Sequence, residues 1–128
     1  MSSLHHVEIW VPDFAATRPR WDWLFAELGW APYQDWPGGR SWRAGDGAYL
    51  VLEESPDLRT DVPYDRRRAG LNHLAVTADR STVDRLAAAG PAHGWELLFA
   101  DRHPHAGGPQ TYAAYLADAD GFEVEVVA

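Results

Sequence analysis

The sequence contains no cysteine, carries 11 basic residues against 19 acidic ones, and has no long apolar run. Without cysteine the chain has no disulfide, no thiolate zinc site and no cysteine nucleophile. A formal net charge of −8 lacks the basic footprint that a nucleic-acid backbone requires. No stretch approaches the ~20 apolar residues of a membrane span, and no signal-peptide pattern is visible. We therefore expect a cytoplasmic protein whose partners include neither nucleic acid nor membrane.

The composition that is present fits one compact domain over residues 1–128, of which 46% are apolar. Seven of the 128 residues are tryptophan, which is a high aromatic content. Some of them are expected in the core, and an aromatic-lined cavity is the other reading. The only basic cluster, Arg66 to Arg68, is interpreted as a solvated loop, with an anion contact as the alternative.

The order of expected elements repeats once along the chain. Residues 4–11 alternate as a strand does, and a helix with Trp21, Leu24, Phe25 and Leu28 on one face follows and ends at Gly29. That helix either begins near Thr17, with Pro19 in its first turn, or begins earlier and kinks. Strand-like runs at 40–44 and 48–53 complete module one, about 1–54, and a polar connector covers about 55–70.

The pattern then starts again as module two, about 71–128. Residues 71–76 echo residues 4–9, and Ser81 opens a helix with Asp84 at capping-box spacing. Gly90-Pro91 closes this helix, and three strand-like runs follow at 95–100, 111–116 and 122–127. The sequence thus predicts an α+β fold of two pseudo-symmetric βαβββ modules.

The repeat brings candidate metal ligands into equivalent positions. His6 and His73 occupy matching places in the repeated first strands. On the last strand Phe122, Val124 and Val126 share one face, while Glu123 and Glu125 share the other. Two imidazoles and one carboxylate form a set that holds Fe(II), manganese, nickel or zinc and leaves positions open for a bidentate substrate.

These motifs together resemble the vicinal-oxygen-chelate superfamily of glyoxalases, extradiol dioxygenases, fosfomycin-resistance thiol transferases and bleomycin-binding proteins. The carriers are the segments 4–13, 71–76 and 118–125, of which the last is similar to the family's Asp-Pro-Asp-Gly turn with Ala119 in place of proline. The resemblance covers nearly the whole chain. It implies two curved sheets that form a cup, a homodimer, and one divalent metal ion bound by His6, His73 and Glu125. It selects His6 over His5 and Glu125 over Glu123.

The sequence departs from the glyoxalases at their fourth ligand. Four residues after Gly121 stands Glu125, but four residues after Gly47 stands Val51. Glu53 lies two residues further on the same face and is a candidate catalytic carboxylate, with an ordinary exposed glutamate as the alternative. A three-ligand site resembles the dioxygenases and thiol transferases more than the glyoxalases.

Other candidate residues flank this set. Glu8 and Trp10 share the face of His6 and are expected to bind substrate, whereas His5 points with Val7 and is interpreted as structural. The loop 101–108 is either a lid that offers His103 or His105 as a general acid or base, or a solvated hairpin loop, which we favour.

The predicted function is a metal-dependent enzyme that acts on a small molecule with vicinal oxygens. The alternative is a metal-free binding protein that sequesters an aromatic or cationic compound, similar to the bleomycin-resistance branch. Acidic charge and abundant tryptophan favour that alternative, and the His-His-Glu set favours the enzyme.

Overall fold

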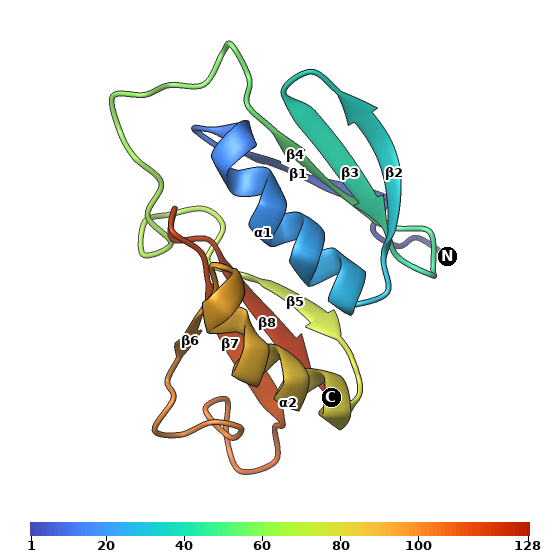
Figure 1. The fold of residues 1–128 in the computed structure, drawn as a ribbon, viewed down its shortest axis with the longest axis vertical. Helices are drawn as coiled ribbons and strands as arrows, with labels where there is room; N and C mark the ends of the chain where they lie inside the picture. Colours follow the sequence, from blue (N-terminus) through green and yellow to red (C-terminus); the bar gives the residue numbers. More distant parts are fainter. The chain divides into compact units, whose positions relative to one another are not determined.

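The computed structural model describes residues 1–128, which form two compact units, Met1–Val62 (unit 1) and Pro63–Ala128 (unit 2). Each unit has a strand, a helix and three further strands in chain order (Figure 1). The predicted α+β fold of two βαβββ modules is confirmed. The boundary after Val62 lies within the segment 55–70 that was expected to connect the modules. Unit 1 contains β1 (His6–Trp10), α1 (Phe14–Glu27), β2 (Ala31–Trp36), β3 (Gly39–Arg43) and β4 (Tyr49–Glu53); unit 2 contains β5 (Leu74–Thr77), α2 (Arg80–Ala89), the short 3₁₀ helix η1 (Gly90–His93), β6 (Glu96–Leu98), β7 (Ala113–Ala117) and β8 (Glu123–Val127).

The two sheets have the same topology. Unit 1 has the strand order β1-β4-β3-β2, and unit 2 has the order β5-β8-β7-β6. In each sheet the first strand pairs in parallel with the last, and the remaining pairs are antiparallel. Both histidine-bearing segments therefore lie beside the strand that follows an Asp-Gly turn.

The first helix begins at Phe14 and not near Thr17, one of the two starts that the sequence permitted. Asp13 is its N-cap, since its carboxylate accepts from the backbone N–H of Ala16 at 3.0 Å, and Pro19 lies inside the helix. Gly29, at φ +76°, follows the last turn as expected. The alternative with a start before Thr17 is the one observed.

Strand β2 was not predicted. Its residues are exposed except for the half-buried Trp36, and they include Pro32, so no apolar alternation marks them as a strand. As an edge strand it tolerates proline, because only one side must supply hydrogen bonds. Its pairing with β3 shows a register irregularity between Pro32 and Gln34.

The cap predicted for the second helix was wrong by two residues. Asp79, not Ser81, is the N-cap of α2, and its carboxylate accepts from the backbone N–H of Thr82 at 2.8 Å. Ser81 lies inside the first turn, where its hydroxyl donates to the same carboxylate at 2.9 Å. Aspartate and serine both favour the N-cap position, so the sequence alone does not distinguish Asp79 from Ser81.

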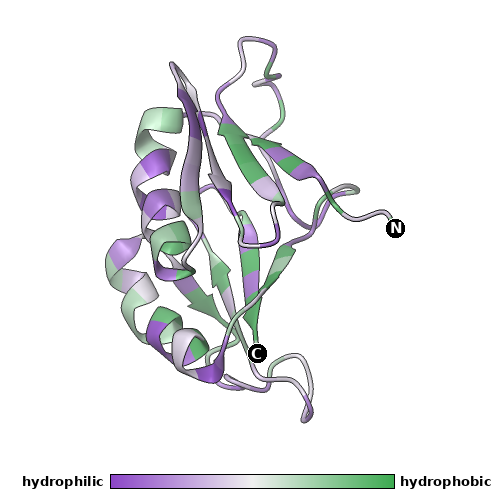
Figure 2. Ribbon diagram, turned by 90° about the vertical axis from the view of Figure 1, so that its right-hand side faces the viewer, coloured by the Kyte–Doolittle hydropathy of each residue, from purple (hydrophilic) through white to green (hydrophobic).

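Each unit buries one face of its sheet against its own helix. In unit 1 the Phe25 ring lies 4.9 Å from that of Trp42, and Trp21 and Leu24 are fully buried. In unit 2 Val83 and Leu86 of α2 are fully buried, as are Leu116 and Val126 of the sheet. Both helices carry mixed hydrophilic and hydrophobic residues (Figure 2), as expected for helices with one face on a sheet and the other in solvent.

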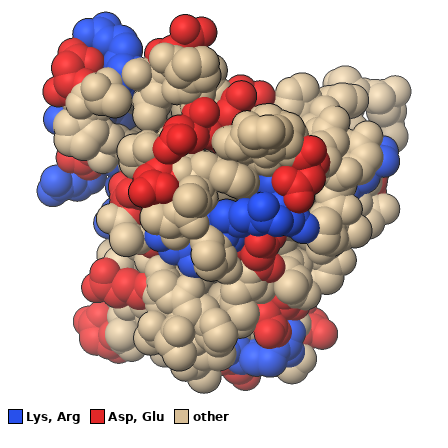
Figure 3. Space-filling model, turned by 45° about the horizontal axis from the view of Figure 1, so that its top comes forward, with Lys and Arg blue, Asp and Glu red and all other residues tan.

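Several arginine side chains form ion pairs with aspartate or glutamate. On the face in Figure 3 basic side chains are flanked by acidic ones. Of the basic cluster, Arg67 contacts Asp65 at 3.2 Å and is 80% exposed, in line with the solvated-loop reading. Arg66 instead contacts Glu123 at 3.6 Å. No helix combines the length and the apolar character that a bilayer crossing demands.

Candidate functional site

Two of the three predicted metal ligands meet in unit 2. His73 immediately precedes β5, and Glu125 lies on β8 opposite Ala75 in the parallel register. His73 Nε2 is 3.3 Å from Glu125 Oε2, and the Glu125 side chain is 14% exposed. The strand pairing thus presents an imidazole nitrogen and a carboxylate oxygen to one another on the sheet face opposite α2.

Glu123 lies on the same face but contacts the other side of the imidazole. Its Oε2 is 3.7 Å from His73 Nδ1 and 3.6 Å from Arg66 Nη1, and its side chain is only 3% exposed. A buried carboxylate requires a positive or hydrogen-bonding partner, and Arg66 is the cation beside it. The geometry gives Glu125 and Glu123 different surroundings although both point to one face.

Tyr115 belongs to this cluster and was missed by sequence reasoning. It lies opposite Glu125 in the antiparallel β7–β8 pair, and its ring centroid is 6.2 Å from that of His73. Burial, followed by a hydrogen bond to Glu125, raises the pKa of Tyr115 to about 12. A signal existed: a hairpin centred on Asp120 places Tyr115 opposite Glu125, because each lies five residues from it.

The third predicted ligand, His6, belongs to unit 1. Its ring stacks on Tyr49, opposite it on β4, at 4.9 Å between centroids and 9° between planes. The Nδ1 atoms of His5 and His6 are 2.9 Å apart. His5, which the alternation groups with Val7 and which was interpreted as structural, is exposed, and its ring packs against those of His6 and Tyr49. The prediction that His6 joins His73 and Glu125 stays a prediction.

The predicted substrate-binding residues Glu8 and Trp10 share the face of His6. The Trp10 indole donates to Glu8 Oε2 at 2.6 Å, and Trp10 is 40% exposed. Val51 lies opposite Glu8, and Glu53 lies opposite Trp10. Glu53 therefore shares this face, half-buried, as the alternation predicted. Its catalytic role stays a prediction.

The loop between β6 and β7 is anchored at several points. Ala113 N–H donates to Pro104 O at 2.9 Å, and His105 Nδ1 lies 2.8 Å from Thr111 O. A Cβ on Gly107 would lie 2.6 Å from the Tyr115 hydroxyl, so this part of the loop packs directly on that hydroxyl. His103 is half-buried in the loop, and its role as a general acid or base stays a prediction.

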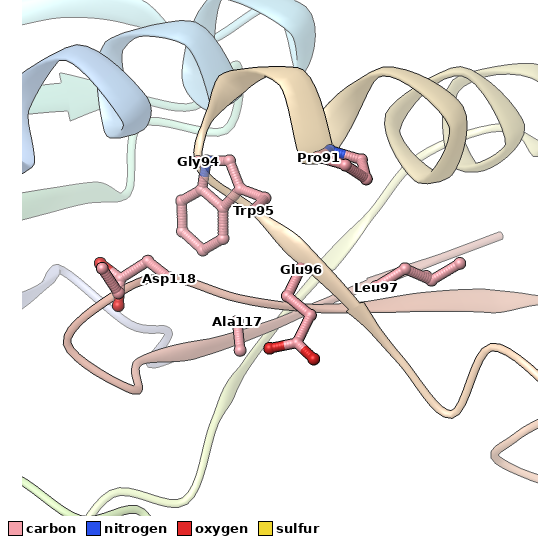
Figure 4. Close-up of a pocket in the computed structure, with 8 residues that line it drawn as sticks. Pro91, Gly94, Trp95, Glu96, Leu97, Ala117 and Asp118 are labelled. Carbon is pink, nitrogen blue, oxygen red and sulfur yellow. The ribbon is translucent and has the colours of Figure 1, made fainter.

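The structure also contains a shallow apolar hollow that includes none of the predicted site residues. It has a volume of about 530 Å³ and lies between η1 and the β6–β7 edge of unit 2 (Figure 4). Trp95 and Leu97 line it, with Asp118 at its rim. Asp118 Oδ1 already accepts from the backbone N–H groups of Asp120 and Phe122, so this carboxylate holds the turn before β8.

The donor atoms of each unit can be compared with the ligand set of a divalent metal ion. Neither unit by itself contains three or more His, Asp or Glu side chains in ligating positions. Unit 2 supplies the His73–Glu125 pair with its nitrogen and oxygen atoms 3.3 Å apart. These atom types and this spacing fit two ligands of one divalent ion.

Comparisons with known proteins place this architecture in a family. The family model described as Glyoxalase/Bleomycin resistance protein/Dioxygenase superfamily matches residues 5–115. The uncharacterised protein YqjT of Bacillus subtilis (strain 168) is 41% identical over 126 residues, 98% of each chain. A crystal structure of a candidate glyoxalase from Bacillus halodurans is 43% identical, with a TM-score of 0.90 over 98% of this chain and 94% of that chain.

A more distant structure adds a metal-bound relative of the same fold. The genomically encoded fosfomycin resistance protein FosX from Listeria monocytogenes was crystallised with Mn(II) and sulfate. It has a TM-score of 0.67 and 19% identity over 100% of this chain and 90% of that chain. At this identity the likeness shows the fold alone. The sequence match and the repeated βαβββ topology together show that the chain belongs to the glyoxalase/bleomycin resistance protein/dioxygenase superfamily.

Proposed function

We propose that the chain is a divalent-metal-dependent enzyme that acts on a small molecule with two adjacent oxygen atoms. The observation that carries this is the 3.3 Å separation between His73 Nε2 and Glu125 Oε2. Metal–ligand distances of roughly 2.0–2.2 Å put neighbouring ligand atoms about 3.0 Å apart at right angles and about 3.4 Å apart at the tetrahedral angle. The pair has the spacing of two ligands on one ion.

His6 is proposed as the third ligand, and iron, manganese, nickel and zinc are the candidate metals. The Mn(II) bound to FosX supports a divalent ion in this fold. A bound divalent ion would supply a Lewis acid that polarises the oxygen atoms of a chelating substrate.

Tyr115 is proposed to hold the Glu125 carboxylate in place. The phenol of Tyr115 is protonated at neutral pH, as any tyrosine is, and is a hydrogen-bond donor to Glu125; burial and this hydrogen bond raise its pKa to about 12. Such outer partners orient a ligand and support its binding. Glu8 and Trp10 are proposed to contact substrate, and His103 is proposed as a general acid or base.

A three-ligand site favours dioxygenase-like or thiol-transferase-like chemistry over glyoxalase chemistry. Val51, at the position equivalent to Glu125, has no donor atom and is only 5% exposed. Two or more coordination positions would remain for both oxygens of a substrate. Glu53 is the one acidic residue on the same face of β4, and its recruitment would restore the carboxylate of a glyoxalase.

Metal content and calorimetric titration test this proposal. The purified protein, stripped with a chelator and titrated with Fe(II), Mn(II), Ni(II) and Zn(II), is expected to bind about one ion per chain. His73→Ala is expected to weaken the affinity more than 100-fold, since loss of an outer-shell partner alone costs 10- to 100-fold. His93→Ala, which removes an exposed imidazole in η1 outside the cluster, is the control and should bind like the wild type. Absence of binding by the wild type would refute the proposal.

A metal-free binding protein is the second candidate function. Exposed aromatic rings on unit 1 favour it, since Trp10 is 40% exposed and Tyr33 is 46% exposed beside Tyr49. Such rings suit a planar or cationic ligand. Binding of an aromatic cation such as bleomycin with equal affinity in excess chelator would support this function over the enzyme.

Two further properties belong to the proposal. We expect a homodimer, which sedimentation equilibrium measures, and a cytoplasmic location, which fractionation of the source cells measures.

A further inference from the structure

The side chain before His73 contacts the imidazole nitrogen that faces away from Glu125. Asn72 Oδ1 lies 2.7 Å from His73 Nδ1, and Asn72 Nδ2 donates to the carbonyl oxygen of Arg66 at 3.0 Å. The two ends of an amide are assigned from their partners. A backbone carbonyl only accepts, so the NH₂ group must face Arg66 and the oxygen must face His73.

This orientation decides which nitrogen of His73 carries the hydrogen. An amide oxygen cannot donate, so Nδ1 must be the donor in the 2.7 Å contact. Glu123 Oε2, 3.7 Å from the same nitrogen, is a second acceptor on that side. A neutral imidazole carries one hydrogen, for which Glu125 Oε2, 3.3 Å from Nε2, is the competing acceptor. The Nδ1 contact with Asn72 is much shorter at 2.7 Å, so it takes the hydrogen and leaves the Nε2 lone pair on the side of Glu125.

We infer that Asn72 is a positioning residue that holds His73 as the Nδ1–H tautomer and so keeps Nε2 free to bind a cation. The inference rests on the proposed metal site for its purpose, but the tautomer itself exists without a metal. Metal-bound histidines in general have a hydrogen-bond partner on their other ring nitrogen, and this partner sets the tautomer and the ring orientation. Asn72 is such a partner for His73.

The connector supports Asn72 by packing against β8 and the turn before it. The Tyr64 ring stacks on Phe122 at 4.1 Å between centroids, and its hydroxyl donates to Leu71 O at 2.7 Å. Arg66, whose carbonyl holds the Asn72 amide, contacts the buried Glu123 at 3.6 Å. The last residues of the connector are therefore fixed on both sides of Asn72, and the amide has a defined partner at each end.

Unit 1 shows the same arrangement with a different residue type. His5 occupies the position equivalent to Asn72, and its Nδ1 lies 2.9 Å from His6 Nδ1. An imidazole can donate or accept, so this contact leaves the tautomer of His6 open. In unit 2 the amide oxygen of Asn72 can only accept, so the contact fixes the tautomer of His73.

The tautomer is measured by long-range ¹H–¹⁵N NMR of the metal-free protein with ¹⁵N-labelled histidine. The chain has 6 histidines, and His73→Gln identifies the signals of His73. Spectra at about pH 9, well above the ordinary histidine pKa of ~6.5, report the neutral ring. We expect the Nδ1–H form in the wild type and a substantial Nε2–H population in Asn72→Ala. Asn72→Asp keeps an acceptor oxygen and should retain the Nδ1–H form. Gln110→Ala, an exposed amide elsewhere, is the control.

Calorimetric titration of the same variants measures the consequence for binding. Asn72→Ala should lose about 10-fold or more in affinity, while Asn72→Asp and Gln110→Ala should not. An Nε2–H wild type, an unchanged tautomer in Asn72→Ala, or a changed tautomer with unchanged affinity would overturn the inference. If the wild type binds no metal but shows the expected tautomers, the proposed function fails while the positioning role of Asn72 is supported.

Discussion

Removal of Arg66 should destabilise the fold because it leaves Glu123 buried without its cation. The Arg66 Nη1–Glu123 Oε2 distance is 3.6 Å, and the side chains are 30% and 3% exposed. At an effective dielectric constant of about 20 this separation corresponds to roughly 4–5 kcal/mol of gross attraction. Desolvation offsets part of it, and removal of one partner of a fully buried pair costs about 3–5 kcal/mol. The partial exposure of Arg66 reduces our expectation for Arg66→Met to about 2 kcal/mol.

This magnitude is measurable by urea denaturation or by thermal melting. For a chain of 128 residues, 2 kcal/mol corresponds to a decrease of about 7 °C in Tm. Glu123→Gln removes the charge, so we expect the double variant to be more stable than the sum of the two single losses predicts, by about 1 kcal/mol or more. Arg67→Met is the matched control, because Arg67 is 80% exposed and a surface ion pair contributes little.

Two outcomes would refute this reasoning. A loss for Arg66→Met no larger than that for Arg67→Met would show that Glu123 does not need its cation. Strict additivity of Arg66→Met and Glu123→Gln would show that the two groups are not coupled. Either result would also weaken the role of the connector as a support for Asn72.

Three further predictions concern the helix cap, the reaction type and Tyr115. Asp79→Ala should lower Tm by about 2–7 °C at pH 7, and Ser81→Ala by clearly less, as differential scanning calorimetry would show. Hydrogen bonds from Thr82 and Ser81 lower the pKa of Asp79, so its stabilisation is complete above the ordinary value near 3.8, is lost as pH falls below it, and the Asp79→Ala difference should shrink there. An ultraviolet thioester assay should show negligible isomerisation of the methylglyoxal–glutathione hemithioacetal with nickel or zinc; robust turnover abolished by Glu53→Gln would instead identify a glyoxalase. Tyr115→Phe should weaken metal binding by about 10-fold in calorimetry without unfolding the protein; unchanged affinity would contradict its role at Glu125.

The fold was accessible from the sequence because its strongest signals are local and occur twice. A Leu-x-His start and an Asp-Gly turn before the last strand recur in both modules, and together they fix the order of elements. β2 carries no such signal, since exposure of its residues removes the apolar alternation on which strand prediction depends. The predicted N-cap of α2 was wrong for a related reason. Asp79 and Ser81 are both good cap residues, and only the backbone conformation decides between them.

The candidate site was only partly accessible because its outer partners come from segments without a motif. His73, Glu123 and Glu125 follow from strand alternation and the turn, and the structure brings these three together. Arg66 and Asn72 lie in or beside a polar connector whose path cannot be read from periodicity. Arg66 contacts the buried carboxylate of Glu123, and Asn72 donates to the backbone carbonyl of Arg66. Both contacts form only in the folded chain.

The two modules share a histidine but not its surroundings, and this difference bears on where the chemistry lies. In unit 1 the residue opposite His6 is Tyr49, which stacks on the imidazole, and the next residue on that face of β4 is Val51. In unit 2 the two positions equivalent to Tyr49 and Val51 are Glu123 and Glu125. An aromatic and an aliphatic side chain add area for an apolar ligand but no charge, whereas two carboxylates beside one imidazole favour a cation strongly. The repeat therefore places two carboxylates beside the histidine of unit 2 and an aromatic and an aliphatic side chain beside the histidine of unit 1.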